Sequence, residues 1–177
     1  MSDYIAGLRE WGEHTGARMF PAMEWKDTFR VPLSAYPPVD FLPYEVPIVY
    51  TTRVANEMPL YSTVLLENHV DDERNARKMV LIGSVPDCPD MLFLFDQDTG
   101  AVVSLDTQEP APQFVNSTLR DFVEFLYRFS SCFADGPGGT ERFGELPEEL
   151  SRNDPAAFEE KSSWWPMIFN EVMLVGE

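Results

Sequence analysis

The sequence predicts an α+β fold in a single domain, residues 1–177, with helices packed against a twisted, largely antiparallel sheet of about five or six strands. Three short segments rich in β-branched and aromatic residues, 78–83, 91–95 and 101–105, follow one another with turns between them, as in a meander. Residues 118–133 then place apolar side chains at helical spacing. A hydrophobic content of 44% in 177 residues is enough to build one core.

The N-terminal segment begins with a predicted helix. Ser2 or Asp3 can cap it, it runs to about His14, and Gly16 supplies its end. Prolines recur over residues 18–46. Because each proline removes a backbone donor and restricts the residue before it, long helices are excluded there.

Extended structure is expected at three places before the meander. Residues 29–31 are a short candidate, followed by loop through Pro47. Residues 48–53 are β-branched and aromatic, which favours a strand, and residues 60–66 are a further candidate. The architecture of residues 1–70 thus depends on local pattern alone.

Residues typical of a turn and of a helix cap define the ends of the elements predicted in the central region. Gly100 supplies the positive φ that closes the loop after Asp96. Thr118 and Asp121 have the spacing of a capping box at the start of the long helix. The apolar face of that helix consists of Leu119, Phe122, Val123, Leu126 and Phe129.

The C-terminal region predicts further helices. The long helix should stop before Gly136. A polar helical stretch is expected around residues 145–150, and Asp154 or Pro155 can start another short one. A last helix is predicted over residues 164–173.

Charge is the strongest compositional signal. Thirteen Lys and Arg against thirty Asp and Glu give a net charge of −17. That field repels nucleic acid and anionic lipid, and it speeds encounter with a basic partner. Charge of this size also serves solubility alone. The absence of a long apolar stretch and of a signal-peptide pattern at the N-terminus predicts a cytoplasmic protein with no membrane contact.

The sequence predicts no catalytic, cofactor-binding or metal-ligating residue. Cys88 and Cys132 have neither disulfide nor metal-type spacing, and His14 and His69 lie in no motif. A Cys132–His69 nucleophile pair stays open, because such partners meet only in the fold. The acidic loop that ends at Gly100 lacks the glycine and glutamate positions of a calcium-binding EF-hand, so it is interpreted as a hairpin turn.

Two aromatic features suggest either packing or binding. Trp164 and Trp165 stand at the start of the last predicted helix, where core packing is the simpler interpretation. The segment 36–44 combines three aromatic residues with three prolines, which is unusual for a loop. It could form a rigid recognition surface or a lid over the sheet.

Three motifs carry a resemblance to a known family. They are Leu81-Ile-Gly83 at a strand end, Phe95-Asp-Gln-Asp-Thr-Gly-Ala-Val102 in the hairpin, and Val115-Asn-Ser-Thr-Leu-Arg-Asp-Phe122 at the helix start. The chain thereby resembles the SUKH superfamily of immunity proteins, most closely its fourth subfamily, of bacterial polymorphic toxin systems. Residues 78–133 are the best-matched part.

The resemblance implies an immunity protein that binds and neutralises a cognate toxin, a nuclease or a deaminase, by non-catalytic contact. Such a toxin would present a basic surface. Two other function classes remain open: a small-molecule enzyme or binding protein with an aromatic pocket under the Pro-rich segment, and a scaffold that binds a host protein. The expected contact residues lie in loops at strand ends: Tyr36, Tyr44, Asp71, Asp72, Glu73, Asp87 and Asp90.

Overall fold

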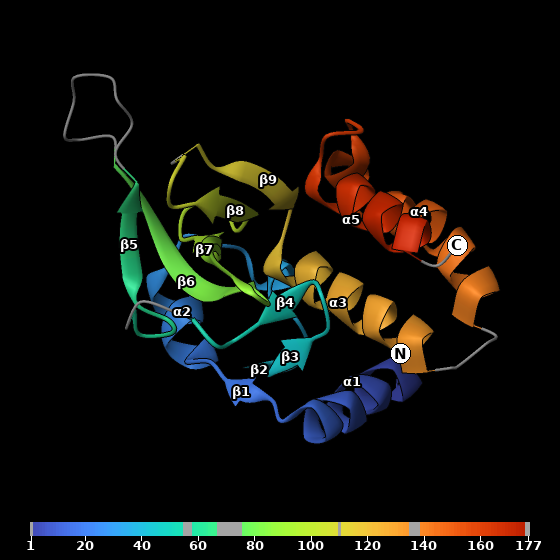
Figure 1. Cartoon of the computed structure of the whole chain (residues 1–177). Coiled ribbons are helices and arrows are strands. Elements are labelled where there is room, and N and C mark those ends of the chain that lie inside the picture. The colour runs from blue at the N-terminus through green and yellow to red at the C-terminus, as the bar shows by residue number, and fades with distance from the viewer. Residues whose placement is uncertain (1, 55–57, 67–75, 110, 135–138, 176–177) are drawn as a thin grey trace.

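The computed structural model describes residues 2–54, 58–66, 76–109, 111–134 and 139–175, which form helices on one side of a twisted antiparallel sheet (Figure 1). The helices are α1 (Ser2–Thr15), α2 (Ala22–Thr28), α3 (Leu119–Ala134), α4 (Gly139–Asn153) and α5 (Trp164–Val175), with short 3-10 helices η1 (Leu33–Ala35) and η4 (Pro155–Phe158). The strands are β1 (Arg18–Met19), β2 (Phe41–Leu42), β3 (Glu45–Val46), β4 (Tyr50–Thr51), β5 (Thr63–Leu66), β6 (Arg77–Val85), β7 (Cys88–Asp96), β8 (Val102–Asp106) and β9 (Gln113–Asn116). The predicted α+β class is confirmed.

Among the described residues, the main sheet has seven strands in the order β3-β4-β6-β7-β8-β9, with β5 paired to β6 beside β4. The long strand β6 therefore has two neighbours on one edge: β5 pairs with its first half and β4 with its last residues. All pairs are antiparallel, as predicted. β1 and β2 form a separate two-stranded ribbon.

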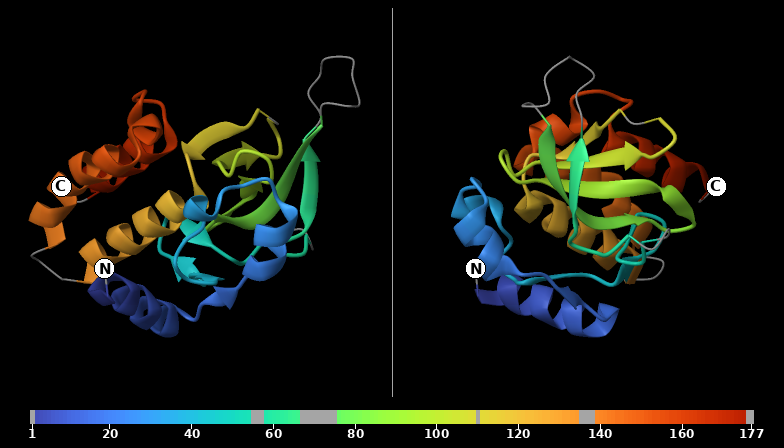
Figure 2. Two further views of the ribbon diagram at one scale, coloured as in Figure 1. Left: turned by 180° about the vertical axis from the view of Figure 1, so that it is seen from behind. Right: turned by 90° about the vertical axis from the view of Figure 1, so that its left-hand side faces the viewer.

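The helices cover one face of the sheet, and Figure 2 shows α3, α4 and α5 on the same side of it. Phe93 of β7 packs at 5.2 Å between ring centroids against both Phe122 of α3 and Trp164 of α5. Phe122 is fully buried, and Trp165 is also fully buried. The two helices expected to pack on one face do so, and both tryptophans belong to the core.

The opposite face of the sheet is also apolar. Its buried cluster consists of Met79, Leu81, Leu92, Leu94, Val103 and Leu105, with Val64 and Leu66 of β5 packed at its margin. The run 91–95 thus contributes side chains to both faces, as its uninterrupted hydrophobicity indicates.

Local expectations in the N-terminal part are less accurate. α1 and its end at Gly16, which has a φ of +70°, match the prediction. Residues 29–31 were expected to be extended; Phe29 has an extended backbone, but residues 29 and 30 form a bend and no strand. They follow α2, a seven-residue helix that the proline pattern did not reveal. The strand expected over 48–53 is reduced to β4, because Ile48 has a φ of +72° and turns the chain between β3 and β4.

The C-terminal predictions hold, and one strand was missed. α3 stops at Ala134, α4 contains the expected helical stretch 145–150, and α5 begins at Trp164. β9 was not predicted, because it is only four residues long and runs almost directly into α3. Among the described residues no helix has the length and apolar character needed to cross a bilayer.

Candidate partner-binding surface

The hairpin motif between β7 and β8 has a structural role. The Asp96 carboxylate accepts hydrogen bonds from the backbone N–H groups of Asp98, at 2.8 Å, and Thr99, at 3.1 Å, and it forms an ion pair with Arg77. Burial alone would raise the pKa of Asp96, but these donors outweigh burial and lower it. Gly100 closes the turn with a φ of +82°, as predicted.

The motif at the start of α3 also holds the fold together. Buried Asn116 donates from Nδ2 to Asp154 at 3.1 Å and accepts from Trp165 Nε1 at 2.9 Å. The Asp154 carboxylate further accepts from the backbone N–H and the hydroxyl of Ser117, both at 2.7 Å. Thr118 caps the helix by accepting from the Asp121 N–H at 3.0 Å. This network joins β9 and α3 to the ends of α4 and α5.

The third motif ends at Gly83, where Tyr50 crosses β6. A Cβ atom at Gly83 would lie 2.7 Å from the Thr51 carbonyl oxygen and would overlap the Tyr50 ring. The Tyr50 hydroxyl donates to the Ile82 carbonyl at 2.5 Å. Glycine is required because the tyrosine approaches the backbone so closely. All three motifs therefore act in the fold.

The structure describes three of the four histidine and cysteine residues. His14 is exposed, and its Nδ1 lies 2.7 Å from the Glu10 carbonyl oxygen of its own helix. Cys88 is exposed in β7, and Cys132 is buried in α3. His69, its conceivable partner, lies outside the described residues. Within the described part of the chain, no three His, Cys, Asp or Glu side chains are grouped to hold a metal ion.

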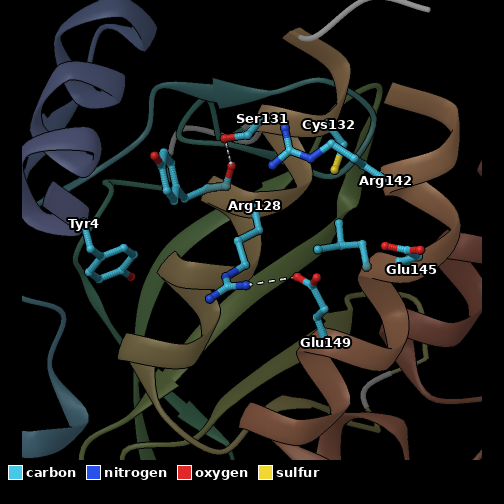
Figure 3. A pocket seen from close by; sticks show the side chains of 9 residues that line it. Tyr4, Arg128, Ser131, Cys132, Arg142, Glu145 and Glu149 are labelled. Carbon is cyan, nitrogen blue, oxygen red and sulfur yellow. Dashed lines mark hydrogen bonds and ion pairs between the residues drawn. The ribbon is translucent and has the colours of Figure 1, made fainter. Parts of the chain in front are cut away.

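A cavity of about 300 Å³ lies between α1, α3 and α4 (Figure 3). Arg128 projects into it and forms ion pairs with Glu124 at 2.8 Å and Glu149 at 3.2 Å. Tyr4 lines it from α1, and burial, together with Glu124, raises the pKa of this tyrosine. The guanidinium of Arg128 is thus already paired with two carboxylates of the protein.

The predicted contact residues separate into three groups. Tyr36 is only 3% exposed and packs against Phe95 at 5.9 Å, and burial raises its pKa to about 12, so its ring is not part of the surface. Asp71, Asp72 and Glu73 lie outside the described residues. Tyr44, Asp87 and Asp90 lie partly or fully at the surface.

Tyr44 lies at the centre of a cluster that the sequence did not predict. The guanidinium groups of Arg18 and Arg53 each lie 5.0 Å from the centroid of its ring. Arg53 Nε also donates to the Tyr44 hydroxyl. These residues come from β1, the β2–β3 connection and the segment after β4, so no local spacing could have indicated the cluster. We call it the Tyr44 stack.

A groove of about 420 Å³ opens beside the Tyr44 stack. Arg53, Glu45 and Asp87 bring charge to its lining, while Val54, Val85, Pro86 and Pro89 give it an apolar floor and wall. Asp87 occupies the β6–β7 turn with a φ of +60°.

Asp90 lies one residue beyond the groove lining and is held by neighbouring groups. Its carboxylate accepts from the Thr107 hydroxyl at 3.1 Å. The β6–β7 turn and the β8–β9 loop belong to the same end of the sheet, so Asp87, Asp90, Asp106 and Glu109 add negative charge there. An aromatic–arginine stack beside a groove of mixed polar and apolar lining, with an acidic margin, is suited to binding a protein.

A family model for the SUKH-4 immunity protein matches residues 42–171, well over half of the chain. The chain belongs to the SUKH-4 immunity protein family. Comparison with curated proteins and with solved structures finds no match.

The matched range contains all three motifs of this SUKH-4 protein, which confirms the resemblance seen in the sequence. It also contains Tyr44, the groove, Asp87 and Asp90, whereas α1, β1, α2 and η1 precede it. Arg18 of the Tyr44 stack therefore lies outside the matched range. Membership assigns an immunity function and implies a cognate toxin as partner.

Proposed function

We propose that this SUKH-4 protein neutralises its toxin by binding alone, with no chemistry of its own, and that it acts in the cytoplasm. The toxin is a nuclease or a deaminase with a basic surface. The main support for the proposal is the Tyr44 stack, which lies beside a groove with acidic residues at its margin. Tyr and Arg are enriched among residues that dominate binding energy at protein interfaces. Arg53 is held in place by Tyr44 before any partner arrives, which lowers the entropy cost of binding.

The net charge supports a basic partner. A charge of −17 raises the rate of encounter with an oppositely charged surface and repels nucleic acid. Asp87 and Asp90 place part of that charge at the margin of the groove. Asp71, Asp72 and Glu73 remain predicted contacts.

Protein binding is favoured over a small-molecule site under the Pro-rich segment. That alternative requires the aromatic residues of the segment to line a pocket. Tyr36, Phe41 and Leu42 are instead at most 9% exposed and are part of the core. The segment therefore packs onto the sheet and contributes only Tyr44 to the surface stack.

The test is the kinetics of association with the toxin domain encoded beside this gene. The association rate should fall steeply as salt rises, since screening acts over a Debye length of about 10 Å at 0.1 M. Reversal of Asp87 and Asp90 to Lys should slow association, while reversal of the exposed pair Glu159 and Glu160 is a control of equal charge. If binding is tight and the association rate changes neither with salt nor with either charge reversal, the negative charge serves solubility and not recognition.

Tyr44→Ala tests the stack itself. Loss of the ring frees Arg18 and Arg53 from their ordered positions, so dissociation of the toxin should accelerate by about tenfold or more. Unchanged dissociation in a folded variant would contradict the assignment of this surface.

A further inference from the structure

In the part of the chain that the structure describes, β5 is an edge strand of the sheet. Among the described residues it pairs with β6 alone, and Figure 1 shows it at the outer limit of the fold. Natural edge strands are commonly protected by charge, by proline or by a covering segment. The sequence of β5, Thr-Val-Leu-Leu, contains neither a charge nor a proline. Leu65 is 59% exposed.

The register identifies the backbone groups that face outward. The Lys78 carbonyl accepts from the Gln97 N–H at 3.1 Å, so the backbone polar groups of Lys78 point away from β5. Leu65 is the residue directly opposite Lys78. In an antiparallel ladder this makes Leu65 and Lys78 a non-hydrogen-bonded pair. The N–H and C=O of Leu65, and by alternation those of Thr63, are therefore directed to the open edge.

The side chains of β5 leave apolar surface on both faces of this edge. Val64 and Leu66 are half-buried at the margin of the second-face cluster. Leu65 projects to the other face, opposite the exposed Lys78. A strand laid along β5 would pair the open backbone groups and cover all three side chains.

A hydrogen bond links the segment before β5 to the Tyr44 stack. Tyr61, two residues before β5, donates from its hydroxyl to the Arg18 carbonyl at 3.1 Å, and Arg18 lies over Tyr44. Tyr61 has a φ of +68°, a conformation that an aromatic residue rarely adopts. The segment that leads into β5 thus contacts the surface proposed to bind the toxin.

We propose that the open edge of β5 receives an extended segment of the toxin, which adds a strand to the sheet. This rests on the proposed function and specifies how the partner docks: backbone bonds along β5 supply affinity, and the Tyr44 stack and groove supply selectivity. A second copy of this chain is disfavoured as the occupant, because two molecules of charge −17 repel each other, whereas a basic toxin is attracted.

The test is binding of the toxin domain encoded beside this gene to Leu65→Pro, with Leu65→Ala as the matched control. Proline removes only a donor that faces the open edge, so the ladder to β6 is kept, and proline is tolerated at such positions. An unpaired carbonyl is then left on the toxin strand, and binding should weaken by roughly tenfold or more relative to Leu65→Ala. Met173→Ala, at an exposed apolar position on α5, should bind like the native chain.

Amide hydrogen exchange of the native chain supplies a readout that needs no variant. The amides of Thr63 and Leu65 should exchange rapidly in the free protein and become protected in the complex. If the native chain does not bind the toxin domain, the proposed function fails. If it binds but Leu65→Pro binds equally well and both amides stay unprotected, strand addition is overturned and the proposed function stands. If both amides become protected in the chain alone as its concentration and the salt rise, the occupant is a second copy, which also overturns the proposal.

Discussion

The buried network around Asp154 is the part of the fold where a single substitution should be most informative. Asp154 is 2% exposed and accepts three hydrogen bonds, from Asn116 Nδ2, the Ser117 N–H and the Ser117 hydroxyl. Asp154→Ala leaves Asn116 Nδ2, on a fully buried side chain, without this acceptor, and the Ser117 N–H loses its acceptor in a partly buried position. At about 1–3 kcal/mol for each unsatisfied buried group, the expected loss of stability is roughly 2–4 kcal/mol. The Ser117 hydroxyl adds little, because Ser117 is exposed and water can replace the acceptor.

Urea unfolding monitored by tryptophan fluorescence measures this loss. Asp154→Asn is the control: its carbonyl oxygen can replace one acceptor, so it should lose less stability than Asp154→Ala. Combining Asp154→Ala with Trp165→Phe should give a loss different from the sum, because both partners hold Asn116. A loss below about 0.5 kcal/mol for Asp154→Ala, or strict additivity, would refute the view that the network joins β9 and α3 to the C-terminal helices.

Three further outcomes follow from the core and the motifs. Phe122→Ala should cost roughly 3–5 kcal/mol and Leu126→Ala roughly 2–5 kcal/mol in urea unfolding, since both side chains are fully buried; losses near zero would contradict the packing of α3. The lowered pKa of Asp96 contributes stability that is present above the ordinary pKa of an aspartate and is lost as pH falls through the lower, folded value. Arg77→Met should therefore destabilise at pH 7, with a difference from the native chain that shrinks below about pH 4 in unfolding experiments; a difference independent of pH would contradict the ion pair. Gly83→Ala should lower the free energy of unfolding by about 1–3 kcal/mol, measured by thermal unfolding, because the added methyl group would lie 2.7 Å from the Thr51 carbonyl oxygen. An unchanged melting temperature would show that the Tyr50 ring and the Thr51 carbonyl move aside without loss of stability.

The central part of the fold could be predicted because its signals are local. The meander and α3 each carry a hydrophobic period that matches the secondary structure, and Gly100 and Thr118 mark the turn and the cap. α2 could not be predicted in the same way. It lies among prolines, and its stability comes from Trp25, which stacks on Phe95 of β7 at 5.7 Å. That contact is tertiary, so no sequence window reports it.

The candidate surface was predictable only in part. Loops at strand ends are exposed in general, which placed Asp87 correctly in an exposed turn. Asp90 was also expected in a loop, but it is a half-buried residue of β7. The same reasoning failed to show that Tyr36 is buried, because a Pro-rich segment with alternating aromatics can fold inward as readily as outward. Arg18 and Arg53 could not be singled out from the sequence, because charged residues are common in it. Only the fold brings these two side chains to the ring of one tyrosine.

The residues that identify the family and the residues proposed to bind the partner are different sets. Gly83 allows Tyr50 to approach the backbone of β6, and Asp96 accepts hydrogen bonds within the β7–β8 turn. Asn116 joins β9 to Trp165 at the start of α5. All three act inside the fold. None of the three lies in the Tyr44 stack or on the β5 edge. The three motifs behind the family resemblance thus belong to the scaffold, whereas the proposed toxin contacts are surface side chains outside these motifs. Substitutions at the Tyr44 stack and at Leu65 should consequently alter toxin binding while the unfolding transition of the chain stays in place.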